Sequence, residues 1–122
     1  MSMQINQCLH AAILVSDLER AKHFYGNVLG LSQVDRSLKY PGAWFQAGAF
    51  QIHLIVDETI QTQLHNSEKF GRNRHIAFSV TNLEDAKVQL LAHGCEVQAS
   101  ASGRAALFTY DPDGNVIELN AE

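Results

Sequence analysis

The sequence predicts an α+β fold of two tandem βαβββ modules, in which the strands form a curled mixed sheet with the helices outside. The first observation behind this prediction is an internal repeat, because the 13-residue segments that begin at His10 and at His75 share seven identities without a gap. The second is that the same separation, 65 residues, places His53 on Glu118 near the end of each copy. The third is the order of patterns, since each copy reads as a strand, a helix and three further strands.

The first module begins with an apolar run, Leu9–Val15, that suits a buried strand. Ser16 and Asp17 are helix N-cap residue types. The apolar residues after them recur at helical spacing, and Gly30 is a typical residue for the end of a helix. Three more strands are expected at about 32–39, 42–48 and 50–56.

The second module repeats this order after a polar linker at residues 58–73. Thr81 and Asn82 are the expected N-cap pair, and Gly94 ends the helix. The Asp111–Asn115 segment is a strong turn signal between the last two strands. The three strands after the helix are expected at about 95–99, 104–110 and 115–120. We therefore expect one domain over residues 1–122, with module one at 7–60 and module two at 72–121.

Composition narrows the class of protein. The 122 residues are 46% hydrophobic and 18% charged, as in an ordinary globular domain, and no apolar run approaches the ~20 residues of a membrane span. A net charge of −4 argues against a broad nucleic-acid surface. Two cysteines make no disulfide framework, and the first residues lack the Lys or Arg of a secretory signal. A cytoplasmic protein with reduced thiols is expected.

Four side chains are candidates for a metal site. Side chains along a strand alternate between its two faces. In each of four strands, the bulky apolar residues share the face that would pack under a helix, and the opposite face, with smaller or more polar residues, carries one candidate ligand: His10, His53, His75 or Glu118. Because the repeat makes them two pairs of counterparts, they are expected to converge at a pseudo-twofold axis. A lone strand histidine is more often a core residue, but four such groups favour one divalent ion, Zn, Ni, Fe or Mn. The remaining histidines are expected to be exposed: His23, His65 and His93.

These features resemble the vicinal oxygen chelate superfamily. The resemblance rests on the doubled βαβββ pattern, on a histidine that opens the first and fifth strands, and on the motif D-P-D-G-N-x-I-E that ends at Glu118. The resemblance covers essentially the whole chain. It implies the fold of glyoxalases, bleomycin-resistance proteins and dioxygenases, and it implies that this chain is a small two-module member similar to glyoxalase I. It also implies that His10, His75 and Glu118 are metal ligands. His53 takes the fourth position, where glyoxalase I usually has a carboxylate and methylmalonyl-CoA epimerase has an amide.

The resemblance implies three classes of function. The leading one is a metal-dependent lyase or isomerase of the glyoxalase I type (lactoylglutathione lyase-like), in which the metal chelates adjacent substrate oxygens and Glu118 transfers a proton. His53 would then bind the metal or act as a second proton carrier. The second is an Fe(II) extradiol ring-cleaving dioxygenase that uses His10, His75 and Glu118. The third is a non-catalytic, bleomycin-resistance-like protein that binds a small molecule.

The partners expected from the resemblance are a small-molecule substrate and a second copy of the chain, with no nucleic acid and no membrane. The substrate is expected to be anionic or a thiol conjugate, since arginines are available to contact it: Arg36, Arg72, Arg74 and Arg104. Four aromatic residues lie in the strands before those of His53 and Glu118 and either line the site or belong to the core: Trp44, Phe45, Phe108 and Tyr110. Whether the four candidate ligands meet within one chain or across a homodimer stays open.

Overall fold

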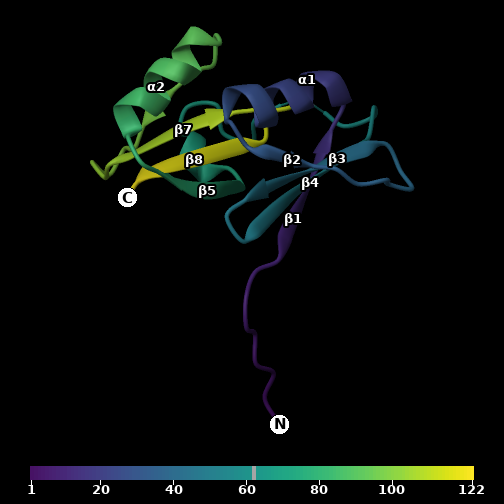
Figure 1. Ribbon diagram of the computed structural model, residues 1–122. Coiled ribbons are helices and arrows are strands. Elements are labelled where there is room, and N and C mark those ends of the chain that lie inside the picture. Colours follow the sequence, from purple (N-terminus) through teal and green to yellow (C-terminus); the bar gives the residue numbers. More distant parts are fainter. Residues whose placement is uncertain (62) are drawn as a thin grey trace.

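Two four-stranded mixed sheets make up the protein, which we describe from a computed structural model of residues 1–61 and 63–122 (Figure 1). In the first sheet the strand order is β1-β4-β3-β2, and in the second it is β5-β8-β7-β6. The elements of the first half are β1 (His10–Val15), α1 (Leu18–Lys22), η1 (His23–Val28), β2 (Ser32–Val34), β3 (Gly42–Ala47) and β4 (Phe50–Val56). Those of the second half are η2 (Phe70–Arg72), β5 (His75–Val80), α2 (Leu83–Ala92), β6 (Gln98–Ala99), β7 (Ala106–Tyr110) and β8 (Val116–Ala121).

The sequence repeat corresponds to the same pairing of strands in both sheets. Strand β1 runs parallel to β4 with Ala12 opposite His53, and β5 runs parallel to β8 with Ala77 opposite Glu118. In both sheets the two remaining strands follow in antiparallel order. The α+β class and the doubled βαβββ order predicted from the sequence are therefore confirmed.

Several details differ from the sequence-based expectations. The strands form two sheets in one chain rather than one continuous curled sheet. The strands expected at 32–39 and 95–99 are much shorter, because β2 pairs with β3 over three residues and β6 pairs with β7 over two. The first helix widens after Lys22 into a π-helix, in which the amide of Leu29 donates to the carbonyl of Phe24 at 2.9 Å. This widened turn directs Phe24, Tyr25 and Val28 into the core together.

The two modules share one core on the helix side of the sheets. Tyr25 and Phe45 from the first module pack in the same cluster as Ile117 and Leu119 from the second. Side chains from the β7–β8 turn reach across as well, since Asp113 accepts a hydrogen bond from the Ser16 amide at 3.0 Å. The modules are therefore held by apolar packing and by buried polar contacts.

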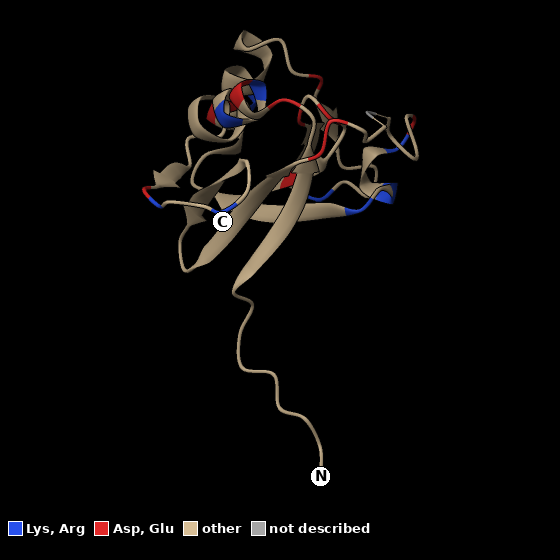
Figure 2. Cartoon of the chain, turned by 90° about the vertical axis from the view of Figure 1, so that its right-hand side faces the viewer, with Lys and Arg blue, Asp and Glu red and all other residues tan. Residues whose placement is uncertain are grey.

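Charged residues of both signs lie mainly on helix and loop segments, and most of the strand ribbon carries uncharged residues (Figure 2). Among the described residues, no helix has the length and apolar character that crossing a membrane requires.

Candidate metal centre

The first pair of candidate ligands lies on the exposed face of the first sheet. His10 is exposed on β1, and His53 lies on the neighbouring strand β4 with 7% of its surface accessible. The two imidazole rings are stacked, with centroids 3.9 Å apart and an interplanar angle of 12°. Trp44, which pairs with His53 across β3 and β4, stacks on the other side of the His53 ring at 3.8 Å and 1°. His53 is thus sandwiched between two aromatic rings.

The surroundings of His53 disfavour its charged form. Burial lowers the pKa of its imidazole, and the nearby His10 and Arg36 lower it further. Arg36 lies over the indole of Trp44 at 4.3 Å, so it extends the stack of rings with a cation. On the edge of the ring, His53 Nε2 lies 2.9 Å from the side-chain oxygen of Gln51.

The second pair lies on the corresponding face of the second sheet. His75 Nε2 is 3.0 Å from Oε1 of Glu118, a carboxylate with only 6% of its surface accessible. His75 Nδ1 lies 2.7 Å from the backbone carbonyl of Asn73. Because a carbonyl oxygen only accepts, Nδ1 is the donor, and the second nitrogen is directed toward the carboxylate. Phe108 packs edge-on against the His75 ring with centroids 5.5 Å apart.

A cationic groove borders Glu118. The Arg104 guanidinium donates from Nη1 to Glu118 Oε2 at 3.3 Å and to the side chain of Asn120 at 3.4 Å. Together with Lys69 and Arg72, Arg104 lines a groove of about 210 Å³. Of the arginines selected from the sequence, Arg104 and Arg72 therefore lie beside the second pair and Arg36 beside the first. The fourth, Arg74, lies next to His75 in a separate groove between the two modules.

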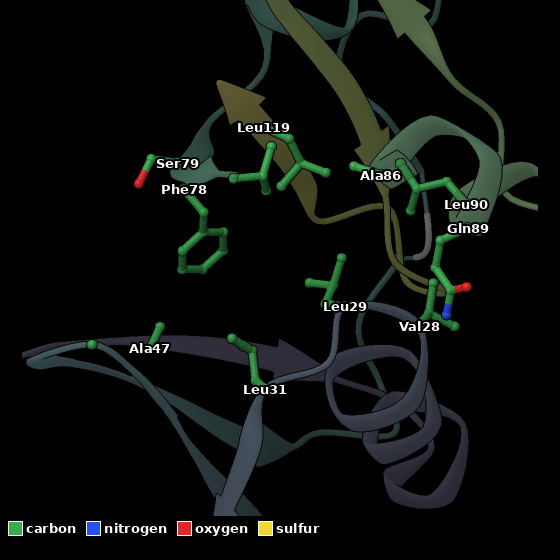
Figure 3. Close-up of a pocket in the computed structure, with 12 residues that line it drawn as sticks. Val28, Leu29, Leu31, Ala47, Phe78, Ser79, Ala86, Gln89, Leu90 and Leu119 are labelled. Carbon is green, nitrogen blue, oxygen red and sulfur yellow. The ribbon is translucent and has the colours of Figure 1, made fainter. Parts of the chain in front are cut away.

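Within one chain the structure brings the four candidates together as two pairs. Among residues 1–61 and 63–122, no group of three or more His, Cys, Asp or Glu side chains lies close enough to hold one metal ion. The reason is the division into two sheets, each of which carries one pair on its exposed face. His23, His65 and His93 are exposed, as expected from the sequence. The cavity of about 430 Å³ between the modules is lined by apolar residues such as Leu29, Phe78 and Leu119, and none of the four candidates lines it (Figure 3).

The donor chemistry of the second pair fits a divalent ion. A metal-binding histidine commonly donates one ring N–H to a carbonyl, which fixes the tautomer and presents the other nitrogen to the metal. His75 is held in this way by Asn73, with a carboxylate oxygen 3.0 Å from its other nitrogen. Imidazole nitrogen and carboxylate oxygen are both ligands for Zn, Ni, Fe and Mn. The residues present therefore suit such an ion, and His75 and Glu118 would supply half of its protein ligands.

Sequence reasoning missed several groups that hold these side chains. Asn73 fixes His75, and Gln51 holds the edge of the His53 ring. Gln51 shares the strand face of His53, so alternation alone could have found it. Asn73 precedes the strand, and no pattern in the sequence marks it. Of the aromatic residues that either line the site or belong to the core, Trp44 lines it by stacking on His53, and Phe45 belongs to the core. Phe108 does both, since it packs edge-on against His75 and belongs to a small buried cluster against which Tyr110 packs.

Comparison with known proteins identifies the family. Residues 7–119 match the family model of the Glyoxalase/Bleomycin resistance protein/Dioxygenase superfamily, so the chain belongs to this superfamily. The chain is 31% identical over 120 residues to a lactoylglutathione lyase of Salmonella typhimurium, over 91% of this chain and 89% of the relative. It is 29% identical to the mitochondrial methylmalonyl-CoA epimerase of Homo sapiens, over 90% of this chain and 70% of the relative. The fosfomycin resistance protein FosX from Listeria monocytogenes has the same fold, with a TM-score of 0.77, 21% identity, and 98% of this chain and 93% of that chain covered.

Proposed function

We propose that the protein is a metal-dependent lyase or isomerase of the glyoxalase I type, which acts on a small carbonyl compound or its conjugate. The observation that carries this proposal is the pair of His75 and Glu118, in which a tautomer-fixed imidazole nitrogen lies 3.0 Å from a carboxylate oxygen. The similarity to a lactoylglutathione lyase supports this class of reaction. The cofactor would be one divalent ion, Zn, Ni, Fe or Mn. A solved structure of the Listeria relative contains Mn(II).

The complete site would form in a homodimer, where the first sheet of one copy faces the second sheet of its partner. Each chain offers one pair of donors on each of two exposed strand faces, so a twofold arrangement would produce two equal sites. The N-terminal segment supports this arrangement. Leu9, Ile5 and Met3 continue the alternation of Ile13 and Val15, yet they are 62%, 82% and 86% exposed on a segment that leaves the body of the chain (Figure 1). A second copy would remove this apolar surface from water.

Glu118 would move the proton in this reaction. When bound, the metal ion supplies Lewis acidity toward two neighbouring oxygens of the substrate. Glu118 is the only carboxylate among the four candidates, so it would take a proton from one substrate carbon and return it to the adjacent carbon. Arg104 holds the other carboxylate oxygen, which orients Glu118 against the face of the sheet. Only 6% of the surface of Glu118 is accessible, which would limit the access of water to the proton in transit.

The groove beside Glu118 indicates an anionic substrate. Lys69, Arg72 and Arg104 concentrate positive charge within about 210 Å³ in a protein whose net charge is −4. Guanidinium and ammonium groups bind carboxylates and phosphates strongly, so a carboxylate-bearing conjugate such as a glutathione adduct suits this groove.

A ring-cleaving Fe(II) dioxygenase is the second candidate. It is favoured by the sandwiched position of His53, which would leave His10, His75 and Glu118 as a set of two histidines and one carboxylate. Iron-loaded protein would then consume oxygen with a catechol. Absence of uptake with several catechols would argue against this candidate.

Formation of lactoylglutathione from methylglyoxal and glutathione tests the main proposal. We expect turnover by protein loaded separately with Ni, Zn, Mn and Fe(II), and a loss of about 10²–10⁴-fold in Glu118→Gln because the general base is removed. Glu58→Gln, in an exposed loop, is the matched control and should retain full activity. Activity of Glu118→Gln at the wild-type level would refute the role of Glu118. Protein that neither binds nor is stabilised by any of these ions would support the non-catalytic binding class instead.

A further inference from the structure

A chain of hydrogen bonds leads from the backbone of the β3–β4 hairpin to the ring of His53. It begins at Gln46, whose side-chain nitrogen lies 2.7 Å from the carbonyl of Gly48 and 3.4 Å from the carbonyl of Phe50. Carbonyl oxygens only accept hydrogen bonds. The Gln46 group that faces them is therefore its NH₂ group, and its oxygen must point the other way.

The orientation of Gln46 determines that of Gln51. The Gln46 oxygen lies 2.8 Å from the Gln51 side chain, so the group that Gln51 presents there must donate and is its NH₂ group. The remaining Gln51 oxygen faces His53 Nε2 at 2.9 Å. Since an amide oxygen cannot donate, His53 Nε2 carries the hydrogen. Through the two glutamines, the two backbone carbonyls therefore determine which nitrogen of the imidazole carries the hydrogen.

The ring stack adds an independent constraint on His53. The lone pair of an imidazole nitrogen lies in the plane of its ring, and Zn–N distances are about 2.0–2.1 Å. The rings of His10 and His53 are nearly parallel, at 12°, with centroids 3.9 Å apart. One ion cannot lie in two nearly parallel planes that are separated in this way. In this arrangement His10 and His53 cannot both bind the same ion.

Of the two histidines, His10 is the one that can turn. His53 is held on its faces by His10 and Trp44 and on its edge by Gln51. His10 is exposed and is packed against another ring only on the side of His53, within the part of the chain that the structure describes. A metal ion would therefore recruit His10 and leave the His53 ring in place.

We propose that His53 is a positioning residue and not a metal ligand: Gln46 and Gln51 hold it as the Nε2–H tautomer, and it supports His10, which binds the ion together with His75 and Glu118 of a second copy. This inference rests on the metal centre of the proposed function. His53 Nδ1 is then the free acceptor of the ring, available to a hydroxyl group or a water molecule of the site. The role of Gln51 is to keep Nδ1 unprotonated, and therefore able to accept a hydrogen bond, throughout the reaction.

Histidine tautomers and ligation can be read by ¹H–¹⁵N correlation spectra of ¹⁵N-histidine-labelled full-length protein. Without metal, we expect a protonated Nε2 and an unprotonated Nδ1 at His53. On addition of Zn, the nitrogen signals of His10 and His75 should shift, and those of His53 should keep their pattern. A protonated Nδ1 at His53, or a Zn-induced shift of His53 as large as that of His75, would overturn the inference.

Two variants separate ligation from support. His53→Phe keeps a ring between Trp44 and His10 but has no nitrogen, so its Zn affinity should fall by no more than about 10-fold, the low end of the range for a supporting group, whereas His75→Phe removes a ligand and should lose more than about 100-fold. An equal loss in both variants would make His53 a ligand. Gln51→Leu should populate both His53 tautomers, and a single Nε2–H tautomer in this variant would remove the role of Gln51. If wild-type protein binds no Zn, the proposed metal centre fails, while the spectra of metal-free protein and of Gln51→Leu still decide the tautomer.

Discussion

The hydroxyl group of Tyr25, in the first module, donates a hydrogen bond of 2.7 Å to Oδ2 of Asp111, in the second. Both side chains are buried, and the Asp111 carboxylate also accepts from the backbone amides of Asp113 and Asn115 and from the side chain of Asn115. The contact therefore joins the first helix to the turn that precedes β8. Since β8 carries Glu118, this buried contact helps to position the candidate metal centre.

Removal of the Tyr25 hydroxyl should destabilise the protein. Tyr25→Phe leaves a buried carboxylate with one donor fewer, so we expect the free energy of unfolding to fall by about 1–3 kcal/mol. Tyr40→Phe removes an exposed hydroxyl and should cost less than about 0.5 kcal/mol. Urea unfolding followed by circular dichroism measures both. Equal effects of the two substitutions would contradict the structural importance of the contact.

Alkaline pH should destabilise the protein through the same tyrosine. Burial raises the pKa of Tyr25 well above 10.0, and the charge of Asp111 raises it further. Above pH 10 the unfolded chain loses this proton while the folded chain keeps it. The stabilising contribution is thus complete below pH 10 and is lost as pH rises toward the folded-state pKa, by up to about 1.4 kcal/mol per pH unit.

The contribution of Tyr25 to this pH dependence can be isolated by comparison. Unfolding free energies of wild type and Tyr25→Phe, measured from pH 8 to 11, should have slopes that differ above pH 10 by about one proton. Tyr110, whose pKa is also raised by burial, is present in both proteins and cancels. Parallel curves would show that Tyr25 titrates alike in the folded and unfolded chains.

Mixed dimers should restore activity if the site forms between two chains. His10→Ala and Glu118→Gln each inactivate both sites of their own homodimer, but a mixed dimer has one site with both natural residues. An equal mixture that exchanges subunits freely should reach about one quarter of wild-type activity. Activity no greater than that of the separate variants, in a mixture shown to contain mixed dimers, would place each site within one chain.

Arg104 should affect substrate binding more than stability. Its side chain is 55% exposed, so its ion pair with Glu118 contributes less than about 1 kcal/mol to folding. We expect Arg104→Ala to raise KM for an anionic substrate by about 10-fold or more, and Arg104→Lys to recover part of this loss. Steady-state kinetics and thermal unfolding measure the two effects. A large fall in melting temperature with unchanged KM would assign Arg104 a structural role instead.

The repeat, the class of fold and the four candidate ligands could all be predicted from the amino-acid sequence. This was possible because strand alternation is local: the side chains of His10, His53, His75 and Glu118 share faces with small or polar neighbours whatever the rest of the chain does. The superfamily followed from the same residues. Element ends were less predictable, since β2 stops after three residues where pairing with β3 ends, and pairing is a tertiary event.

The grouping of the ligands was decided only by tertiary structure. Alternation assigns a side chain to a face, but it cannot say that the strands divide into two sheets, each with one pair of donors. Nor can it assign a proton: the tautomer of His75 depends on the carbonyl of Asn73, and that of His53 on Gln46 and Gln51. These properties depend on hydrogen bonds of about 3 Å, which form only between groups that folding brings together.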